Sequence, residues 1–343
     1  MKALIIGGAG FIGCNIAKRL IDEKDEVLVF DNLSRKGTHS NLRWLQSLGP
    51  VQFFKGDIRQ SEPLVEVFRN QPDIDVVYHM AAQVAVTTSV TNPREDFEIN
   101  AFGTFNVLEA IRSTRADPIL IFASTNKVYG GMEDVEIVEQ DGRYAYGDFP
   151  QGIPEDRILD FHSPYGCSKG AADQYVRDYA RIYGLRTVTF RQSCIYGYRQ
   201  FGIEDQGWVA WFTIQAVLDR PITIYGDGKQ VRDMLFVDDL VDAYQTAIQD
   251  IETTSGKIYN LGGGPRNKMC LHDLIGYLEA LADRKLNYRY DAWRPGDQPV
   301  FVCDVQKAKQ DFGWEPHTSP EEGVRKLFEW VSKNTELFLQ EGL

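Results

Sequence analysis

A tyrosine and a lysine stand four residues apart in the run Tyr165-Gly-Cys-Ser-Lys169. On a helix, this spacing places both side chains on the same face. An unperturbed phenol has a pKa of about 10, which is too high for a base near neutral pH, but a neighbouring positive charge lowers it. The pair therefore predicts acid–base chemistry of the kind that interconverts an alcohol and a ketone beside a redox cofactor.

A glycine-rich run near the start of the chain is a candidate site for that cofactor. Gly7, Gly10 and Gly13 fall between a predicted strand and a predicted helix, and Phe11 and Ile12 open that helix. Glycines at such a turn let the backbone approach a pyrophosphate, and the N–H groups of the helix N-terminus attract its negative charge. The run predicts a dinucleotide site, although a tight loop without a ligand is an alternative for the glycines alone.

Asp31 ends the second predicted strand, about twenty residues after the glycine run. A carboxylate there would bind ribose hydroxyls and repel a 2′-phosphate, which favours NAD over NADP. Arg35 is close enough in sequence to offset part of that repulsion, and capping of a turn is the alternative for Asp31. Other candidate cofactor-binding residues follow the second, third and fourth strands or lie on the next helix: Asn32, Ser34, Asp57, Ile58, Ala81, Ala82, Gln83 and Asn100. Ser124, Tyr165 and Lys169, from later in the chain, complete the set.

Short β-rich runs alternate with amphipathic stretches through the first half of the chain. This alternation predicts parallel strands with right-handed crossovers, and so a Rossmann-type, doubly wound α/β fold. Later, helices mix with short strands and Gly/Pro turns, so we expect a dinucleotide-binding domain over 1–192 and a smaller α/β substrate domain over 193–343, interleaved with late elements of the first. The predicted strands are 2–7, 26–31, 51–55, 75–79, 118–124 and 185–191, and the predicted later helices lie near 207–219, 237–249, 269–283 and 320–334.

The composition limits the partners and the location of the protein. A formal net charge of −12 argues against nucleic acid, whose phosphates require a basic surface. No apolar run is long enough to span a membrane, and the chain begins with a strand pattern instead of a signal peptide. The five cysteines and five histidines are scattered without metal-binding spacing, so we expect a cytoplasmic protein without a metal site.

Ser124 and Thr125 end the fifth predicted strand, at the edge where open α/β sheets bind their ligands. A hydroxyl at this position would relay a proton or hold the substrate oxygen beside Tyr165, and capping of the strand end is the alternative. The segment that follows, 131–162, is rich in Gly, Asp, Glu and Pro. It predicts a long irregular insertion before the Tyr165 helix.

The glycine run, Asp31, the run 124–130 and the Tyr165/Lys169 pair together resemble the extended short-chain dehydrogenase/reductase family of nucleotide-sugar enzymes. The resemblance spans nearly the whole chain. It implies a catalytic triad of Thr125, Tyr165 and Lys169, with NAD as the cofactor.

Two residues depart from part of this family. Sugar 4,6-dehydratases carry an Asp-Glu pair after the triad threonine, whereas this chain has Asn126 and Lys127. Neither side chain supplies the carboxylates that dehydration needs, and the glutamate of the nucleotide-glucuronate decarboxylases is missing as well. What remains is reversible hydride transfer, in which a sugar carbon is oxidised and then reduced from the opposite face.

Longer runs narrow the implied substrate. The segments 160–174, 205–212, 30–37 and 228–233 resemble family members that epimerise a CDP-sugar at C2 for O-antigen lipopolysaccharide. The cytidine comes from the resemblance alone, because no residue distinguishes cytosine from uracil. The alternatives are a UDP-hexose 4-epimerase with the same triad and, from another class, a non-catalytic NAD-sensing regulator.

An acidic protein needs local cations to bind a nucleotide diphosphate. Arg232 and Arg294 match the phosphate-binding arginines of the family, and Lys229 is a further candidate; a surface ion pair is the alternative for each. The resemblance also implies a homodimer or homotetramer, formed through the helix near 94–113 and the Tyr165 helix. The candidate substrate-binding residues are Thr125, Asn126, Gln206, Gly207, Val209, Lys229, Arg232 and Arg294.

Overall fold

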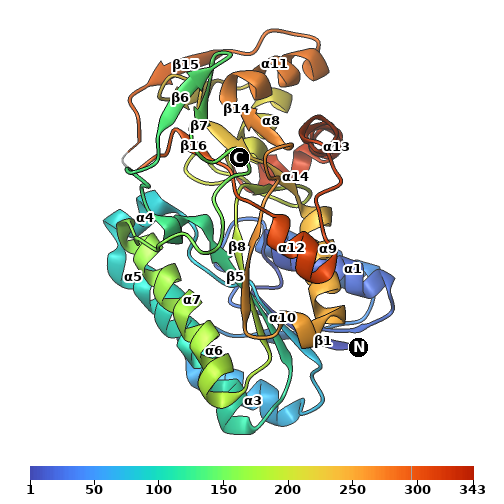
Figure 1. Ribbon diagram of the computed structural model, residues 1–343. Helices are drawn as coiled ribbons and strands as arrows, with labels where there is room; N and C mark the ends of the chain where they lie inside the picture. The colour runs from blue at the N-terminus through green and yellow to red at the C-terminus, as the bar shows by residue number, and fades with distance from the viewer. Residues whose placement is uncertain (295) are drawn as a thin grey trace.

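A parallel sheet of seven strands forms the centre of the larger part of the molecule, as the computed structural model in Figure 1 shows. The structure describes residues 1–294 and 296–343. The strands of this sheet are β1 (Lys2–Ile6), β2 (Glu26–Asp31), β3 (Val51–Lys55), β4 (Val76–His79), β5 (Ile119–Thr125), β8 (Thr187–Gln192) and β13 (Lys257–Leu261). Their order is β13-β8-β5-β4-β1-β2-β3, so the direction of winding reverses between β1 and β4, as in dinucleotide-binding sheets.

Helices cover both faces of this sheet (Figure 1). Leu4 and Ile5 show why both faces need cover: successive strand residues point to opposite sides, and both of these side chains are fully buried. The helices are α1 (Phe11–Asp22), α2 (Thr38–Leu48), α9 (Val237–Gln249) and α12 (Gln306–Phe312) on one face, and α3 (Ser61–Asn70), α6 (Gly103–Thr114) and α7 (Ser163–Tyr183) on the other.

The later half of the chain forms a smaller α/β part, which lies above the sheet in Figure 1 and has its own apolar core. Its elements are β9 (Ile195–Tyr196), α8 (Trp208–Val217), β10 (Ile222–Tyr225), β11 (Val231–Asp233), β12 (Leu235–Phe236), β14 (Lys268–Cys270), α11 (Leu271–Ala282), β15 (Tyr288–Asp291), β16 (Val300–Phe301), α13 (Pro320–Lys333) and α14 (Thr335–Gln340). Short elements complete the chain: α4 (Val86–Thr91), α5 (Pro93–Phe97), the π-helical turn η1 (Glu98–Phe102), the 3-10 turn η2 (Asn126–Tyr129) and α10 (Ile251–Thr254).

The predicted fold class, a Rossmann-type doubly wound sheet, is confirmed. β8 ends at Gln192, where the sequence predicts the domain boundary, and β13, α9 and α12 return from the later half to the first sheet. The four predicted later helices correspond to α8, α9, α11 and α13. Over the residues that the structure describes, none of the helices combines the length and the hydropathy of a membrane span.

The segment 131–162 is not irregular throughout, so that prediction is wrong in part. It contains an antiparallel hairpin of β6 (Ile137–Gln140) and β7 (Arg143–Tyr146). The two turn residues, Asp141 and Gly142, have φ values of 53° and 73°. An Asp-Gly pair with positive φ at both positions is the favoured two-residue hairpin turn. The Asp141-Gly142 dipeptide was therefore a signal for a hairpin, which the overall composition of the segment did not indicate.

Candidate active site

The carboxyl ends of the parallel strands meet at one edge of the sheet, and most predicted site residues lie there. β1 leads to Gly7, Gly10, Phe11, Ile12 and Gly13; β2 to Asp31, Asn32, Ser34 and Arg35; β3 to Asp57 and Ile58; β4 to Ala81, Ala82 and Gln83; and β5 to Ser124, Thr125 and Asn126. The fold thus brings together segments from five strands at the place where such sheets bind ligands.

The glycine loop has no room for side chains at two of its positions. A Cβ on Gly13 would lie 2.2 Å from the Gly7 carbonyl oxygen, and a Cβ on Gly7, whose φ is +83°, would lie 2.6 Å from the Ala81 nitrogen. No side chain caps the N-terminus of α1 at Gly10. The first N–H groups of a helix have no intrahelical acceptor and favour an anion. The loop therefore offers a close, positively polarised approach to a pyrophosphate.

Two carboxylates are fixed at the neighbouring strand ends. Asp31 accepts hydrogen bonds from the backbone N–H groups of Ala9 and Leu33 at 3.0 and 2.8 Å. Burial nevertheless raises the pKa of Asp31 above its usual value. Asp57 accepts from the Arg59 guanidinium at 2.7 Å, and this cation lowers the pKa of Asp57 to about 2. Asp31 is therefore tied to the glycine loop itself, at the position predicted for the ribose.

Asn100 lies on the π-helical turn η1 and supports the loop after β4. Its Oδ1 accepts from the Gln83 backbone N–H at 2.9 Å, and its Nδ2 donates to the Gln83 carbonyl at 3.0 Å. Asp96 accepts from the side chains of Gln83, Asn100 and Ser168, and so links this loop to α7. Asn100 positions the loop in this structure, and its contact with a cofactor stays a prediction.

A cavity of about 400 Å³ lies between the sheet edge and the smaller part of the molecule. This size suits a small-molecule ligand. Thr125 and Tyr165, two of the three predicted catalytic residues, line it. The other predicted residues that line the cavity are Phe11, Ile12, Ser124, Asn126, Gln206, Gly207, Val209, Arg232 and Arg294.

The predicted Tyr165–Lys169 pair lies on one helix, α7, but the two groups do not act as expected on pKa. Burial raises the pKa of Tyr165 to about 12, and hydrogen bonding to Thr125 lowers it only in part. The Lys169 ammonium donates to the Ala123 carbonyl at 2.6 Å and lies 4.5 Å from the centre of the Phe122 ring. Burial lowers the pKa of Lys169 to about 8. The expected lowering of the Tyr165 pKa by Lys169 is absent from the described structure, because the ammonium is bonded to the strand backbone instead.

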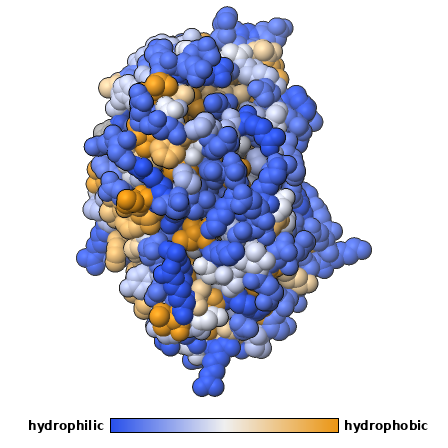
Figure 2. All heavy atoms as spheres, in the orientation of Figure 1, coloured by the Kyte–Doolittle hydropathy of each residue, from blue (hydrophilic) through white to orange (hydrophobic). Residues whose placement is uncertain are grey.

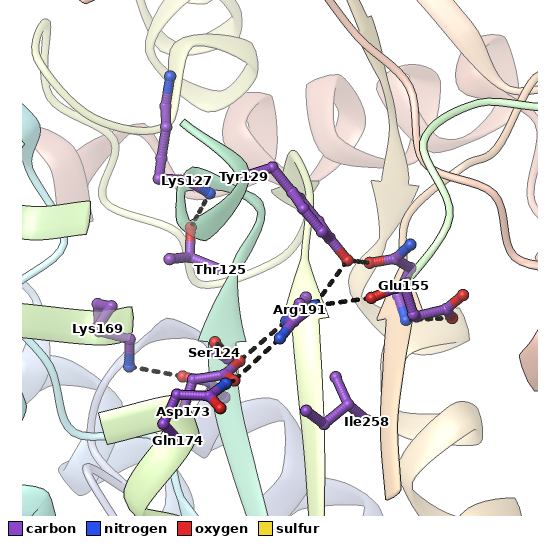
Figure 3. A network of polar contacts seen from close by, with 12 residues as sticks. Ser124, Thr125, Lys127, Tyr129, Glu155, Lys169, Asp173, Gln174, Arg191 and Ile258 are labelled. Carbon is purple, nitrogen blue, oxygen red and sulfur yellow. Dashed lines mark hydrogen bonds and ion pairs between the residues drawn. The ribbon is translucent and has the colours of Figure 1, made fainter. Parts of the chain in front are cut away.

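The Ser124 hydroxyl makes a contact that the sequence did not predict. It donates to Asp173 at 2.7 Å, and Asp173 in turn forms an ion pair with Arg191 (Figure 3). The hydroxyl therefore makes a structural contact inside the protein in this structure, although Ser124 also lines the cavity. Its predicted contact with a cofactor or a substrate oxygen stays a prediction.

Asn126 and Lys127 form the first turn after Thr125 and line the cavity. Thr125 Oγ1 accepts from the Lys127 backbone N–H at 3.2 Å and so caps this turn. The carboxylates that line the cavity, among the described residues, come from the smaller part of the molecule: Glu204, Asp205 and Asp297. The turn beside the predicted catalytic hydroxyls therefore carries an amide and an ammonium, which do not supply a carboxylate pair for elimination of water.

Two arginines face the cavity from the smaller part of the molecule. Arg232 on β11 donates to Asp297 at 2.7 Å. The Arg294 guanidinium lies 3.9 Å from the centre of the Tyr225 ring and 3.1 Å from an Asp205 carboxylate oxygen. Both arginines are oriented by these partners and both line the cavity, as a phosphate-binding role requires.

Lys229 does not line the cavity with these two arginines. Its ammonium forms a surface ion pair with Glu139 at 2.8 Å, and its side chain is not among those that line the cavity. The structure thus places Lys229 in the surface pair that the sequence left open as an alternative, and does not support its predicted contact with substrate.

Several residues that line the cavity were missed by sequence reasoning. The rule that ligands bind at the carboxyl ends of strands would have found the group after β4 and the group after β8. The group after β4 is Val84, Val86 and Thr87, and the group at the end of β8 is Gln192, Ser193, Cys194 and Ile195. The others, Gln200, Thr223, Tyr225 and Leu271, come from the smaller part, where the sequence carries no such signal.

Two hydroxyls in a cavity at the carboxyl edge of a doubly wound sheet, next to a glycine loop, are the arrangement of an extended short-chain dehydrogenase/reductase. The family model described as GDP-mannose 4,6 dehydratase matches residues 4–327, and the chain belongs to this family. The predicted membership among nucleotide-sugar enzymes is confirmed.

Individual relatives include epimerases and dehydratases. The chain is 46% identical to CDP-paratose 2-epimerase of Salmonella typhi, over 97% of this chain and 99% of the relative. A solved structure of UDP-glucose 4-epimerase from Thermotoga maritima with UDP-glucose has a TM-score of 0.84 and 32% identity, covering 98% of this chain and all of the other. A dTDP-glucose 4,6-dehydratase from Streptomyces venezuelae, solved with NAD bound, has a TM-score of 0.85 and 26% identity, covering 99% of this chain and all of the other.

Proposed function

We propose that the chain is an NAD-dependent epimerase of a nucleotide diphosphate sugar, which converts CDP-paratose to CDP-tyvelose at C2 through a transient 2-keto sugar. One observation carries the proposal: Thr125 and Tyr165 face a cavity whose adjoining turn presents Asn126 and Lys127 instead of carboxylates. Such a site supports reversible oxidation of an alcohol but lacks the groups that eliminate water. The 46% identity to CDP-paratose 2-epimerase supports the choice of sugar and carbon.

The residues around the glycine loop fit NAD. Gly7 and Gly13 leave the backbone bare, the uncapped N-terminus of α1 favours the pyrophosphate, and the buried Asp31 favours ribose hydroxyls over a 2′-phosphate. When bound, NAD would take a hydride from the sugar carbon and later return it, so the net redox change is zero. NAD in similar solved structures supports this choice of cofactor.

Tyr165 is the residue that we assign to proton transfer. Its phenolate would accept the proton of the C2 hydroxyl and give it back to the keto oxygen after the sugar has turned over. Thr125 shares the cavity wall and would orient that oxygen by a hydrogen bond. Lys169, on the same helix, would bind the nicotinamide ribose. Arg232 and Arg294 would bind the diphosphate on the opposite wall.

Side-by-side incubation with CDP-paratose and UDP-glucose tests this function. We expect NMR to show inversion at C2 of the CDP-sugar and no change in UDP-glucose. The second candidate, a UDP-hexose 4-epimerase, is favoured by the likeness to the Thermotoga maritima enzyme and would instead produce UDP-galactose. In deuterated water we expect no solvent deuterium at C2, because a hydride that stays on the cofactor does not exchange; incorporation of deuterium would point to a carbanion mechanism.

We also propose that the protein is a homodimer or homotetramer. Exposed apolar side chains gather on α4, α5, η1 and α7, on the left side of the molecule in Figure 2, and a second copy of the same face would cover them. Among them Phe97, Tyr175 and Ile182 are 57%, 52% and 66% exposed. We expect Ile182→Glu to lower the molar mass measured by light scattering. Leu339→Glu, at a similarly exposed position on α14, is the matched control and should leave the mass unchanged.

Finally, we place the protein in the cytoplasm, where it would supply a sugar nucleotide for O-antigen lipopolysaccharide. All five cysteines carry free thiols, which suits a reducing compartment. The resemblance to CDP-sugar epimerases supports the pathway.

A further inference from the structure

Lys127 connects the catalytic strand end with the opposite wall of the cavity. Its backbone N–H donates to Thr125 Oγ1 at 3.2 Å, while its ammonium donates to Gln298 Oε1 at 3.1 Å. Gln298 is fixed in turn, because its amide donates to the Gly130 carbonyl at 2.6 Å. Figure 3 shows the Lys127 side chain pointing away from Thr125 and Lys169. The backbone of Lys127 is therefore bonded to the predicted catalytic Thr125, while its positively charged end extends toward Arg232 and Asp297.

The charges around Lys127 are not balanced within the protein. The nearby carboxylate of Asp297 is hydrogen-bonded to Arg232 at 2.7 Å, so the Lys127 ammonium is left, among the described residues, with the neutral amide of Gln298 as its hydrogen-bond partner. Burial and the repulsion of Arg232 lower the pKa of Lys127 to about 8. An anion placed between Lys127 and Arg232 would turn this repulsion into two attractions. A phosphate has the charge and the acceptor oxygens to do so.

We propose that Lys127 binds the phosphate attached to the sugar and thereby selects C2 as the carbon that is oxidised; the proposal rests on the function proposed above. C2 adjoins the anomeric carbon that carries the diphosphate, whereas C4 lies across the ring from it. For C2 to face Tyr165, the sugar-linked phosphate must lie close to the catalytic hydroxyls. The Lys127 backbone is anchored to Thr125, and its ammonium, which donates to Gln298, lies one side-chain length away in the cavity that Arg232 also lines. A carboxylate at this position, as in the dehydratases, would repel the phosphate instead.

Binding of CDP and CMP to the purified protein tests the phosphate contact, because only CDP has the second phosphate. We expect Lys127→Met to weaken CDP binding about tenfold and to leave CMP binding nearly unchanged, since a charge-assisted hydrogen bond is lost without loss of packing volume. Lys127→Arg keeps the charge and should restore most of the CDP affinity. The matched control is Lys285→Met, which removes an exposed lysine paired with Glu279 and should change neither constant.

The choice of carbon is tested by quenching turnover of CDP-paratose with borodeuteride and locating the deuterium by NMR. We expect deuterium at C2 in the wild type, and in Lys127→Met at least tenfold less deuterium at C2, with Lys127→Arg close to the wild type. Two results would overturn the role of Lys127 if the wild type is active. One is an unchanged ratio of the CDP and CMP dissociation constants in Lys127→Met, and the other is unchanged deuterium labelling at C2 in that variant. A wild type that fails to epimerise the sugar, while Lys127→Met still loses CDP affinity, would instead contradict the function proposed above and leave the phosphate contact standing.

Discussion

Tyr165→Phe is expected to lower the rate of epimerisation about a thousandfold, within the range that positioned acid–base groups contribute. The substitution removes the hydroxyl and keeps the ring of a side chain that is 8% exposed, so packing around α7 should be retained. NAD should remain bound, because the glycine loop and Asp31 are unchanged. The measurement is kcat by product NMR, together with the NAD content of the purified variant. Loss of turnover with NAD retained excludes the non-catalytic regulator.

The pH profile separates a base from a residue that only shapes the cavity. Burial raises the pKa of Tyr165 to about 12, so the phenolate is the minor form at neutral pH and its fraction grows as pH rises. We therefore expect kcat/KM to increase with pH in the wild type. The Lys169 ammonium donates to the Ala123 carbonyl and does not lower the Tyr165 pKa in this structure, so we expect Lys169→Met to leave the pH of the increase unchanged. A flat profile in the wild type, or a Tyr165→Phe variant within tenfold of the wild-type rate, contradicts the role of Tyr165 as the base.

The larger sheet could be predicted because its signals are local. Its strands are buried on both faces, which produces the apolar runs around Leu4 and Val77, and the glycine loop marks the first strand–helix turn. The strand β13 was not predicted, because no such signal marks it in the sequence. It joins the sheet beside β8 only after the smaller part has intervened, and that pairing depends on contacts distant in sequence.

The direction of side chains at the active site was harder to predict from the sequence. Ser124 and Thr125 both line the cavity, but successive strand residues point to opposite sides, so the two hydroxyls have different partners. Register across β5 and β8 pairs Ser124 with Arg191 and Thr125 with Gln192. The Ser124 hydroxyl donates to Asp173, which pairs with Arg191, whereas Gln192 lines the cavity together with Thr125. Alternation was available from the sequence, but the register that decides which residue faces inward was not.

Charge partners were the least predictable feature. The spacing of Tyr165 and Lys169 correctly places them on one helix, yet the Lys169 ammonium donates to the Ala123 carbonyl, which lies 46 positions away in the sequence. Lys229 looked equivalent to Arg232 as a phosphate ligand, but a distant hairpin supplies Glu139 and neutralises it. In both cases the partner comes from another element, and only the tertiary structure brings it near.

The buried ion pair behind the active site leads to the largest expected effect on stability. Asp173 and Arg191 are 0% and 2% exposed and form two hydrogen bonds at 3.0 and 3.1 Å. Arg191 also donates to the Tyr129 hydroxyl and the Glu155 carbonyl, each at 3.2 Å, so the pair joins α7, β5 and β8 to the segment before α7 (Figure 3). Asp173→Leu would leave the guanidinium buried without its carboxylate. We expect it to reduce the free energy of unfolding by about 3–5 kcal/mol, measured by urea denaturation at fixed NAD concentration.

The double variant Asp173→Leu/Arg191→Met distinguishes the cost of an unpaired charge from the loss of the contacts themselves. Removing both charges takes away the desolvation penalty as well as the attraction, so we expect the double variant to be more stable than Asp173→Leu alone. Glu329→Gln, which breaks the exposed pair with Arg325 on α13, should have little effect and serves as the surface control. If the double variant were at least as unstable as the single one, the network through Ser124, Tyr129 and Glu155 would matter more than the pairing of charge. The ends of β5 and β8, which carry Thr125 and Gln192 into the cavity, would then depend on Arg191 as a hydrogen-bond donor and not only as a counter-ion.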